Sequence, residues 1–458
     1  MSAVSAVSAG SSGGLRRTLG FTDLVMITLG TVIGSGIFLV PAVVLRQTGG
    51  RINIALSVWL IGGVVSFLGA LTYAELGAAN PDAGGLYSYI RDAFGPLPAV
   101  LYGWTSFLVI ASGSVATLAV AFSNYLSQLV PMGPVTARLA SVLVIAIIAV
   151  VNIRGTRESS SVENWTTVTK VGALLVLSIA LIAIGRRGSA EPPSPTVPAP
   201  PSLLAGIGLA MIGILWAYEG WQYVTFSAGE TRDPQRVFPR AIAVATGALV
   251  VLYMVANLGY VAALGVNGAA ASDHVAADAM RVAFGPLSGK LFTVLVLVSI
   301  FSAANGLMMT APRLYYSMAR DGVFFARLAH VSERLGTPVA AIVLLAVWSA
   351  LLAVTGTFEQ LLTYVVFTGW IFYGLGAMSV FPSRRKYPTL ARPFRTPGYP
   401  VTPLLFVASA ALLVLNTLRE QPGRALIGLG IVLLGTPAFY LWRARSRRMV
   451  APTASTPL

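Results

Sequence analysis

Two short stretches place glycine beside polar or charged residues inside long apolar runs. The first is Gly30-Thr-Val-Ile-Gly34-Ser35-Gly36-Ile37-Phe38, and the second is Trp216-Ala-Tyr-Glu219-Gly220-Trp221. A half-helix that ends inside a membrane leaves backbone N–H and C=O groups without partners, which is tolerated only where they line a cavity or hold a ligand. The paired breaks therefore predict a binding site for a small zwitterion.

The first stretch predicts the site for the negative charge of that ligand. Its concentration of glycine and hydroxyl residues favours a broken helix. The N–H groups of Ser35, Gly36 and Ile37 would then point the positive end of the following half-helix at an anion. Plain helix packing is the alternative, because Gly30 and Gly34 form a pair of small residues that lets helices approach closely. The matching break in the second stretch favours the binding site.

The second stretch predicts the complementary half. Carbonyl groups freed where its first half ends would accept hydrogen bonds from an ammonium group, and Trp216 is wide enough to close over a ligand. Trp216 and Trp221 could instead belong to an interfacial aromatic belt. Their position in the middle of the run favours the binding site.

Glu219 places a carboxylate at membrane depth, where insertion costs on the order of 3 kcal/mol and such a group is normally partnered or functional. Three roles remain open. An ionised Glu219 would pair with a substrate cation or with Lys170, a protonated one would carry a proton, and a structural one would hydrogen-bond to its neighbours.

Lys170 is the one Lys or Arg that we assign to the interior of a span and to neither side of the membrane. Its long stem could carry the charge to the nearby cytoplasmic interface. Otherwise its ammonium group would act between helices as a bound cation does, tying the first broken span to the run that holds Ser299, Ser302 and Asn305, which offer acceptors. A buried lysine of this kind could also release its proton.

The apolar runs that must position these residues dominate the composition. The chain has 458 residues, of which 56% are hydrophobic and 10% charged, whereas soluble domains have about a quarter charged. The runs are long enough to cross a ~30 Å hydrocarbon core and lack the alternation of a β-barrel. We predict an all-α protein of the lipid bilayer with twelve transmembrane helices, at 24–45, 51–79, 97–130, 138–153, 161–184, 203–226, 240–265, 288–318, 338–355, 357–381, 401–417 and 424–443.

The order of the runs predicts a 5+5 inverted repeat followed by two further helices. Five spans precede a Pro-rich loop, and five more begin again with a glycine-interrupted helix; an odd number of spans inverts the second half. The predicted organisation is a disordered cytoplasmic tail (1–20), repeat one (21–184), the extracytoplasmic Pro-rich loop (185–202), repeat two (203–381), a basic loop with two helices (382–443) and a cytoplasmic tail (444–458).

The distribution of charge predicts that both termini are cytoplasmic. Of the 31 Lys and Arg residues, 21 fall in segments that this orientation places inside, as the positive-inside rule requires. The same rule accounts for the net charge of +15, so nucleic acid is not an expected partner. The chain has no cysteine, and His274 and His330 fall in loops. We therefore expect no metal site, cofactor or enzymatic activity.

Several motifs, weak singly but specific in this order and spacing, resemble the amino acid–polyamine–organocation superfamily. Within it the chain resembles the L-type amino acid transporters and their bacterial exchanger relatives, from Phe21 to about Trp442. The motifs are Gly34-Ser-Gly-Ile-Phe38, Thr72-Tyr-Ala-Glu-Leu-Gly77, Ala83-Gly-Gly-Leu-Tyr87, Trp216-Ala-Tyr-Glu-Gly-Trp221, Gly229-Glu-Thr-Arg-Asp-Pro234, Asn305-Gly, Pro312-Arg-Leu-Tyr315 and Ala319-Arg-Asp-Gly322.

The resemblance implies the 5+5 inverted-repeat fold, sodium-independent alternating access and L-amino acid substrates. It also implies roles for particular residues. Val32, Ser35, Gly36 and Ile37 would meet the substrate carboxylate, and Trp216, Ala217 and Glu219 would present their carbonyls to its amino group. Trp216 would be the gate, and Lys170 would be the conserved lysine of the fifth span. Gln222 and the 112–117 segment would touch the substrate side chain.

The chain departs from the resembled family at two places. Animal relatives carry a cysteine after the third span that tethers a heavy chain, and the segment Val130-Pro-Met-Gly-Pro134 has none. No disulfide-linked heavy chain is therefore expected. Glu219 stands where many relatives have glycine, serine or aspartate, which leaves open a preference for cationic substrates.

These features together predict a secondary transporter of L-amino acids in a bacterial inner membrane, working by exchange or proton-coupled uptake. A transporter of cationic amino acids or polyamines is the alternative. An intramembrane enzyme would need a nucleophile–base pair or metal cluster that the spans do not offer. A non-transporting amino acid sensor on the same fold would be expected to carry an output domain, against which the short tails argue.

Overall fold

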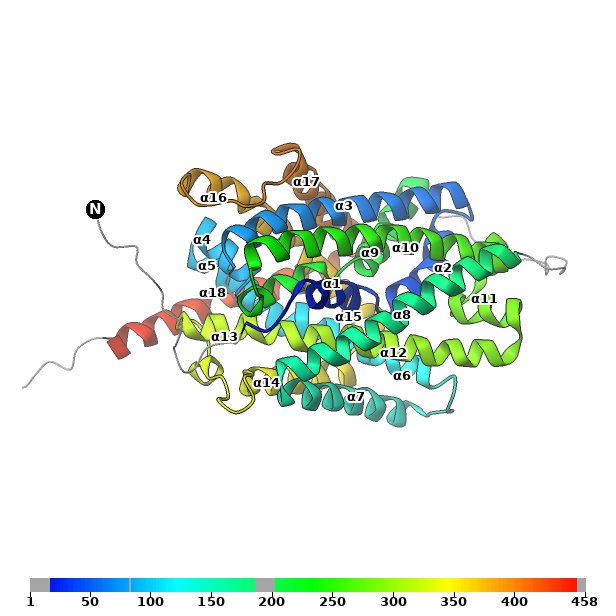
Figure 1. Cartoon of the computed structure of the whole chain (residues 1–458), viewed down its shortest axis with the longest axis horizontal. Helices are drawn as coiled ribbons and strands as arrows, with labels where there is room; N and C mark the ends of the chain where they lie inside the picture. Colours follow the sequence, from blue (N-terminus) through cyan, green and yellow to red (C-terminus); the bar gives the residue numbers. More distant parts are fainter. Residues whose placement is uncertain (1–16, 82–83, 186–201, 451–458) are drawn as a thin grey trace, which may run out of the picture.

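The computed structural model describes residues 17–81, 84–185 and 202–450, with side chains up to residue 444 (Figure 1). In this part of the chain the secondary structure is helical apart from one isolated bridge between Leu19 and Thr231. The all-α prediction is therefore confirmed there. The predicted disordered tail and Pro-rich loop lie almost wholly outside the described residues, as does most of the predicted C-terminal tail.

The helices follow one another along the chain without a sheet between them in the described ranges. Their bounds are α1 (Phe21–Val32), α2 (Gly36–Gln47), α3 (Ile52–Ala79), α4 (Leu86–Phe94), α5 (Pro96–Thr105), η1 (Ser106–Ile110), α6 (Ala111–Leu126), α7 (Pro134–Arg154), α8 (Thr156–Ile184), α9 (Leu203–Ala217), η2 (Trp221–Glu230), α10 (Pro234–Ala271), α11 (Val275–Phe284), α12 (Pro286–Thr310), α13 (Pro312–Arg320), η3 (Ala326–Ala329), α14 (Val339–Thr355), α15 (Phe358–Met378), α16 (Val380–Lys386), α17 (Val401–Glu420) and α18 (Pro422–Val450).

The number of helices able to cross a membrane agrees in part with the twelve predicted spans. Among the described residues, 10 helical stretches are long and apolar enough, or 11 if α1 and α2 count as one bent span. The predicted span at 338–355 corresponds to α14, which has 17 residues and is shorter than the ~20 residues usual for a span. The inverted repeat stays a prediction.

The first predicted break separates α1 from α2, whose axes differ by 44°. Residues 33–35 are not helical: the Ile33 N–H still bonds to the Leu29 carbonyl, but the Gly34 N–H turns back to the Val32 carbonyl at 2.8 Å. The second break follows α9, where Gly220 adopts a φ of 133° that side chains other than glycine rarely accept. Both glycine-rich stretches therefore break their helices as predicted.

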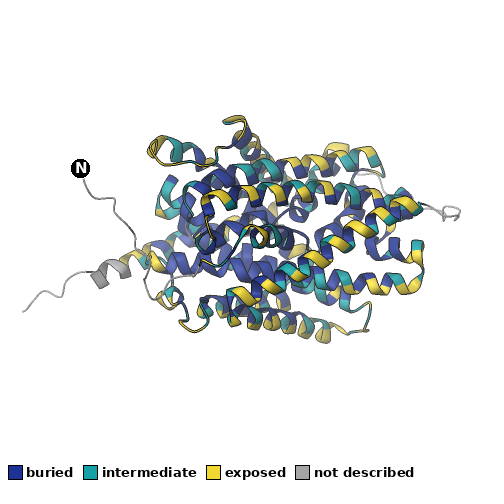
Figure 2. Cartoon of the chain, in the orientation of Figure 1, coloured by how far each residue is buried: buried dark blue, intermediate teal, exposed yellow. Residues whose placement is uncertain are grey.

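The broken helices lie in the interior and the unbroken ones surround them. Figure 2 shows the centre of the molecule dark blue and the outward helix faces yellow. In α7 and α8 the exposed residues include many large apolar side chains, among them Leu139, Leu143 and Val176. An apolar outer surface over a buried polar centre is what a bilayer-embedded bundle requires.

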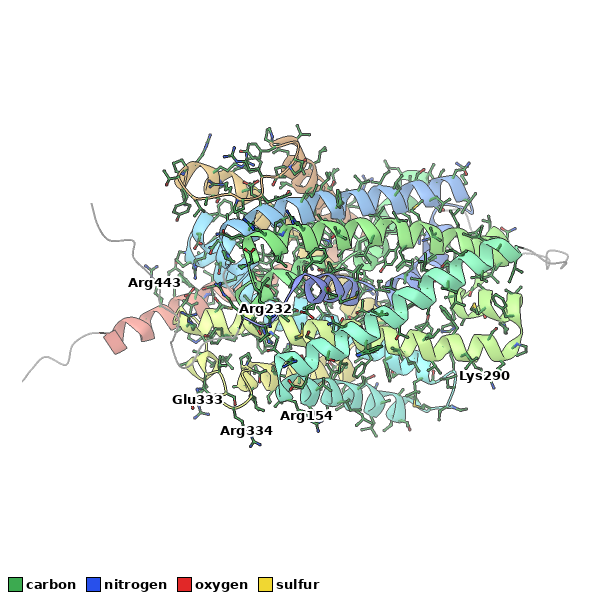
Figure 3. The ribbon with its side chains drawn as sticks, viewed as in Figure 1. Arg154, Arg232, Lys290, Glu333, Arg334 and Arg443 are labelled. Carbon is green, nitrogen blue, oxygen red and sulfur yellow. The ribbon has the colours of Figure 1, made fainter. Side chains whose placement is uncertain are left out.

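One end of the bundle is held by ion pairs. Arg313 of α13 pairs with Glu230 of η2, with 2.6 Å between Nε and Oε1, and both side chains are buried. Arg384 and Arg392 flank Glu75, and Arg91 pairs with Asp321. Figure 3 places the charged residues Arg443, Glu333 and Arg334 towards this end and Lys290 at the opposite one. This is the end that the charge distribution predicts to be cytoplasmic.

We expect replacement of Arg313 by methionine to destabilise the protein strongly. Glu230 would keep a buried charge without its partner, and breaking a buried pair costs about 3–5 kcal/mol. Thermal unfolding of the purified protein in detergent measures the effect. The same substitution at Arg320, which is exposed at the end of the same helix, is the matched control. Equal melting temperatures for the two variants would contradict this prediction.

Candidate functional site

The start of α2 presents free backbone donors, as predicted. Within the described residues, the amide groups of Ser35, Gly36 and Ile37 have no backbone acceptor. The Ser35 hydroxyl is also buried without a partner. Because the N-terminal end of a helix carries a partial positive charge, this cluster suits a carboxylate.

The end of α9 offers fewer free carbonyl groups than predicted. The Trp216 carbonyl accepts from the Glu219 N–H at 3.0 Å, and the Ala217 carbonyl accepts from the Tyr253 hydroxyl at 3.1 Å. The Glu219 carbonyl accepts no hydrogen bond from the described residues. It is therefore the freest acceptor of the three for an ammonium group.

A single hydroxyl on α10 joins the two breaks. Tyr253 Oη lies 3.2 Å from the Val32 carbonyl and 3.1 Å from the Ala217 carbonyl. One hydroxyl has one proton, so it serves one of these carbonyls at a time. A second link is the hydrogen bond of 3.1 Å from Thr31 Oγ1 to the Gly220 carbonyl. The sequence analysis missed Tyr253, because nothing in an apolar span indicates which distant carbonyl a tyrosine reaches.

A small cavity lies where the two breaks meet. It offers about 20 Å³ to the centres of water-sized molecules, and one water needs about 10–15 Å³ by this measure. An amino acid therefore requires the cavity to widen. The lining residues are Thr31, Val32, Gly34, Ser35, Gly36, Ser114, Leu118, Trp216, Glu219, Gly220, Tyr223 and Leu307.

Five of the eight predicted substrate residues thus line this cavity, and three do not. Ile37 contributes its amide at the start of α2 but does not line the cavity. Ala217 packs against Gly36. The Gln222 side chain accepts the Gly220 N–H at 3.0 Å, so it supports the break. Ser114, which lines the cavity, lies in the predicted 112–117 segment.

Glu219 is buried, and its two carboxylate oxygens differ in their surroundings. Oε1 accepts a hydrogen bond of 2.7 Å from the Tyr373 hydroxyl, whereas Oε2 is buried without a partner. Lys170 lies against other groups, so a Glu219–Lys170 pair finds no support in the described contacts. Glu219 lines the small cavity, and a ligand donor bound there could satisfy the unpartnered oxygen.

Lys170 is buried and holds the end of α1. Its Nζ lies 2.6 Å from the Gly30 carbonyl, 2.8 Å from the Ile33 carbonyl and 3.5 Å from the Ser299 carbonyl of α12. Three carbonyl acceptors match the three N–H bonds of an ammonium group, which also suits the negative end of a helix. The alternative that Lys170 reaches the interface is wrong, since its exposure is 2%.

Ser299 supports this link, but Ser302 and Asn305 do not face Lys170 as predicted. The Ser299 hydroxyl donates to the Ile33 carbonyl at 2.9 Å. Ser302 and Asn305 instead donate to the carboxylate of Glu163, at 3.1 and 2.9 Å. The sequence analysis missed Glu163 because it lies in the polar first half of α8, which reads as an exposed surface.

Gly36 is required by close packing against α9. A Cβ at this position would lie 2.6 Å from the Ala217 Cα and 2.7 Å from its Cβ, closer than real atoms approach. Gly36 therefore packs directly against α9, the helix that ends at the second break. The packing alternative raised for Gly30 holds as well, since a Cβ there would lie 1.8 Å from Glu163 Oε1.

We expect Gly36→Ala to weaken ligand binding by at least about tenfold, or ~1.4 kcal/mol, because it pushes the two breaks apart. Gly36→Leu would have a larger effect and should still insert into the membrane. Gly172→Ala is the matched control, since a Cβ there meets nothing within 4 Å. Ligand-induced thermal stabilisation measures binding, and undiminished stabilisation of Gly36→Ala would count against the site.

A larger cavity of about 560 Å³ lies beyond the small one, towards the end of the bundle opposite the Arg313–Glu230 pair. Its lining includes Leu39 and Gly213, which lie about one helical turn from Gly36 and Trp216. Charged and polar residues also line it, including Arg46, Asp273, His274, Glu359 and Arg424. The larger cavity therefore lies on the side of the small one that is predicted to be extracytoplasmic.

Comparison with known proteins gives one family and several relatives. The model of the family described as "Amino acid permease" matches residues 19–433. The human cystine/glutamate transporter is 29% identical over 432 residues, covering 93% of this chain and 85% of that protein. Human large neutral amino acids transporter small subunit 2 is 31% identical over 449 residues, covering 94% and 82%. Mouse b(0,+)-type amino acid transporter 1 is 29% identical over 434 residues, covering 93% and 88%.

The family match extends over both broken helices and the cavity between them. Its relatives are transporters of amino acids, which agrees with the bundle of apolar helices around a polar centre. The chain belongs to the amino acid permease family and is a multi-span membrane protein.

Proposed function

We propose that the chain is a secondary active transporter of L-amino acids that works by alternating access. The observation that carries the proposal is the meeting of opposite backbone charges at one cavity. Ser35 and Gly36, which have free amides at the start of α2, line the same cavity as Glu219, which has a free carbonyl and a carboxylate at the end of α9. A zwitterion is the ligand that satisfies both sides.

In this proposal the amides of Ser35, Gly36 and Ile37, together with Val32, receive the carboxylate. The ammonium group binds at the end of α9, mainly to the Glu219 carbonyl, with Trp216 and Ala217 beside it. Trp216, which lines the cavity, is the gate between the small cavity and the larger one. We assign Gln222 to the support of the break.

Sodium independence is supported by the contacts of Lys170. Its ammonium group occupies the place between α1 and α12 where a transporter driven by sodium would need a cation. We therefore propose exchange or proton-coupled uptake. The proposed substrate cavity is too small for an amino acid and lies beside a larger cavity. Substrate entry must therefore move the two broken helices apart, which supports alternating access.

The names of the relatives refer to different amino acids. The substrate class of this chain is therefore a separate proposal. Neutral L-amino acids fit the zwitterion site as it stands. The buried, unpartnered oxygen of Glu219 favours the second candidate, a transporter of cationic amino acids or polyamines. The proposed location is a bacterial inner membrane with cytoplasmic termini, based on the family resemblance and on the Lys and Arg distribution.

A thermal-shift screen of the purified protein against the standard amino acids and common polyamines tests the proposal. A ligand at 100 times its Kd stabilises the folded state by about 2.7 kcal/mol. We expect stabilisation by one or more L-amino acids. Stabilisation by polyamines alone would favour the second candidate, and stabilisation by neither would overturn the zwitterion site.

A further inference from the structure

Glu163 is a fully buried carboxylate that the proposed substrate site does not use. It lies about two turns before Lys170 on α8, so both side chains leave the same face of that helix. This face packs against α1 and α12. A buried charge is costly unless other groups compensate it, so Glu163 needs an explanation.

The carboxylate is surrounded by hydrogen-bond donors. Asn305 Nδ2 donates to Oε2 at 2.9 Å, Ser302 Oγ donates to Oε1 at 3.1 Å, and Thr167 Oγ1 lies 3.5 Å from Oε1. The orientation of Asn305 is fixed, because its Oδ1 accepts from the Asn152 amide of α7 at 2.9 Å. An amide N–H₂ group can only donate, so this pocket favours the ionised form of Glu163.

Glu163 and Lys170 both contact the same residue of α1. The carboxylate packs directly on Gly30, where a Cβ would lie 1.8 Å from Oε1. The Gly30 carbonyl accepts the hydrogen bond of 2.6 Å from Lys170. A negative and a positive side chain of α8 therefore both approach the last turn of α1 before its break.

Other charged groups around this part of α8 are already engaged. On α1, Asp23 accepts from Ser160 at 3.2 Å and Asn164 at 2.8 Å. Arg313, which touches the start of α8 at Thr156, is paired with Glu230. From α7 and α12, the groups in contact with the carboxylate or its partners are the neutral side chains of Asn152, Ser302 and Asn305.

We propose that Glu163 is the counter-ion of Lys170, a positioning residue that keeps the ammonium group charged where it holds the α1 break. Lys170 needs three protons to serve three carbonyl groups. An ammonium group in an apolar interior keeps them only if a negative charge compensates it. The pair is neutral overall, so the break needs no cation from solution. This inference rests on the proposed transport function.

Transport by Glu163→Gln in proteoliposomes, followed against pH, tests the counter-ion role. Without the carboxylate, no negative charge compensates the buried ammonium group of Lys170, so the variant depends more on protons from solution to keep it charged. We expect exchange by this variant to fall about tenfold or more between pH 6 and pH 9, whereas exchange by the wild type varies much less. Glu163→Asp, which keeps the charge, and Ser302→Ala, which removes one hydrogen bond, should both follow the wild type. A Glu163→Gln profile parallel to that of the wild type would overturn the proposal.

Thermal stability gives a second readout that needs no substrate. In Glu163→Gln the folded state resists protonation of Lys170 more than the unfolded state does, so folding releases protons and stability rises with pH. We expect its melting temperature to approach that of the wild type as pH increases, opposite in sign to its transport. The double variant Glu163→Gln/Lys170→Met should melt above Glu163→Gln at pH 6, because it no longer buries an uncompensated charge.

The two readouts separate this inference from the proposed function. A wild-type protein that exchanges no amino acid would overturn the proposed function and leave the melting profiles as the test of the pair. A wild-type protein that exchanges amino acids, with a Glu163→Gln variant whose melting and transport profiles both parallel it, would overturn the counter-ion role alone.

Discussion

Replacing Lys170 by methionine is expected to reduce amino acid exchange about a hundredfold, or ~2.7 kcal/mol. The carbonyl groups of Gly30, Ile33 and Ser299 would lose their shared donor, and an unsatisfied buried polar group costs about 1–3 kcal/mol. Methionine keeps the length and apolar stem of lysine, so the loss reports the ammonium group. Initial exchange rates in proteoliposomes, with and without sodium, measure the effect.

Lys290→Met is the matched control for this prediction. Lys290 is exposed near the end of the bundle where Figure 3 shows it, so its replacement should leave exchange unchanged. A Lys170→Met variant that exchanges at the wild-type rate would show that the α1 break does not need this ammonium group. Strict sodium dependence of exchange by the wild type would contradict the proposal that the Lys170 ammonium group takes the place of a sodium ion.

Glu219→Gln should weaken binding of arginine and lysine by about 10–100-fold, while binding of alanine and leucine changes by less than about threefold. Hydrogen bonds to charged groups contribute about 1.5–3 kcal/mol, and the free Oε2 is the oxygen available to a cationic side chain. Glutamine has the same shape and can still accept from Tyr373. Thermal-shift titration with the four amino acids compares the affinities.

Tyr373→Phe is the control that separates charge from hydrogen bonding at this position. It removes the bond of 2.7 Å to Glu219 and keeps the carboxylate. We expect this variant to retain any preference for cationic amino acids. Equal losses for cationic and neutral ligands in Glu219→Gln would show that Glu219 supports the cavity and does not read substrate charge.

The two helix breaks were predictable because their causes are local. Glycine-rich sequence beside Ser35 and Glu219 interrupts a helix wherever it lies in the fold, and α2 begins at Gly36, within the stretch where the break is predicted. Lys170 was predictable for a similar reason, since a lone charge in an apolar run must find a partner. Its actual partners are backbone carbonyl groups at the end of α1 and in α12.

The remaining parts of the site depend on contacts between distant segments. Glu163 meets Asn305, and Tyr253 meets Val32, across helices whose rotation no local pattern specifies. The assignment of Ser302 was wrong because one turn along α12 decides whether a side chain faces Lys170 or Glu163. The tight packing of Gly36 on Ala217 also joins segments that are distant in the sequence, so no local pattern predicts it.

The most direct test of a zwitterion site between the two breaks is counterflow in sodium-free proteoliposomes. Vesicles preloaded with an unlabelled L-amino acid that binds should accumulate its radiolabelled form. Vesicles preloaded with the matching amine, which lacks the carboxylate, or with the matching acid, which lacks the amino group, should not accumulate the radiolabelled amino acid. Equal accumulation with either single-charge analogue, or none with any amino acid, would contradict the account.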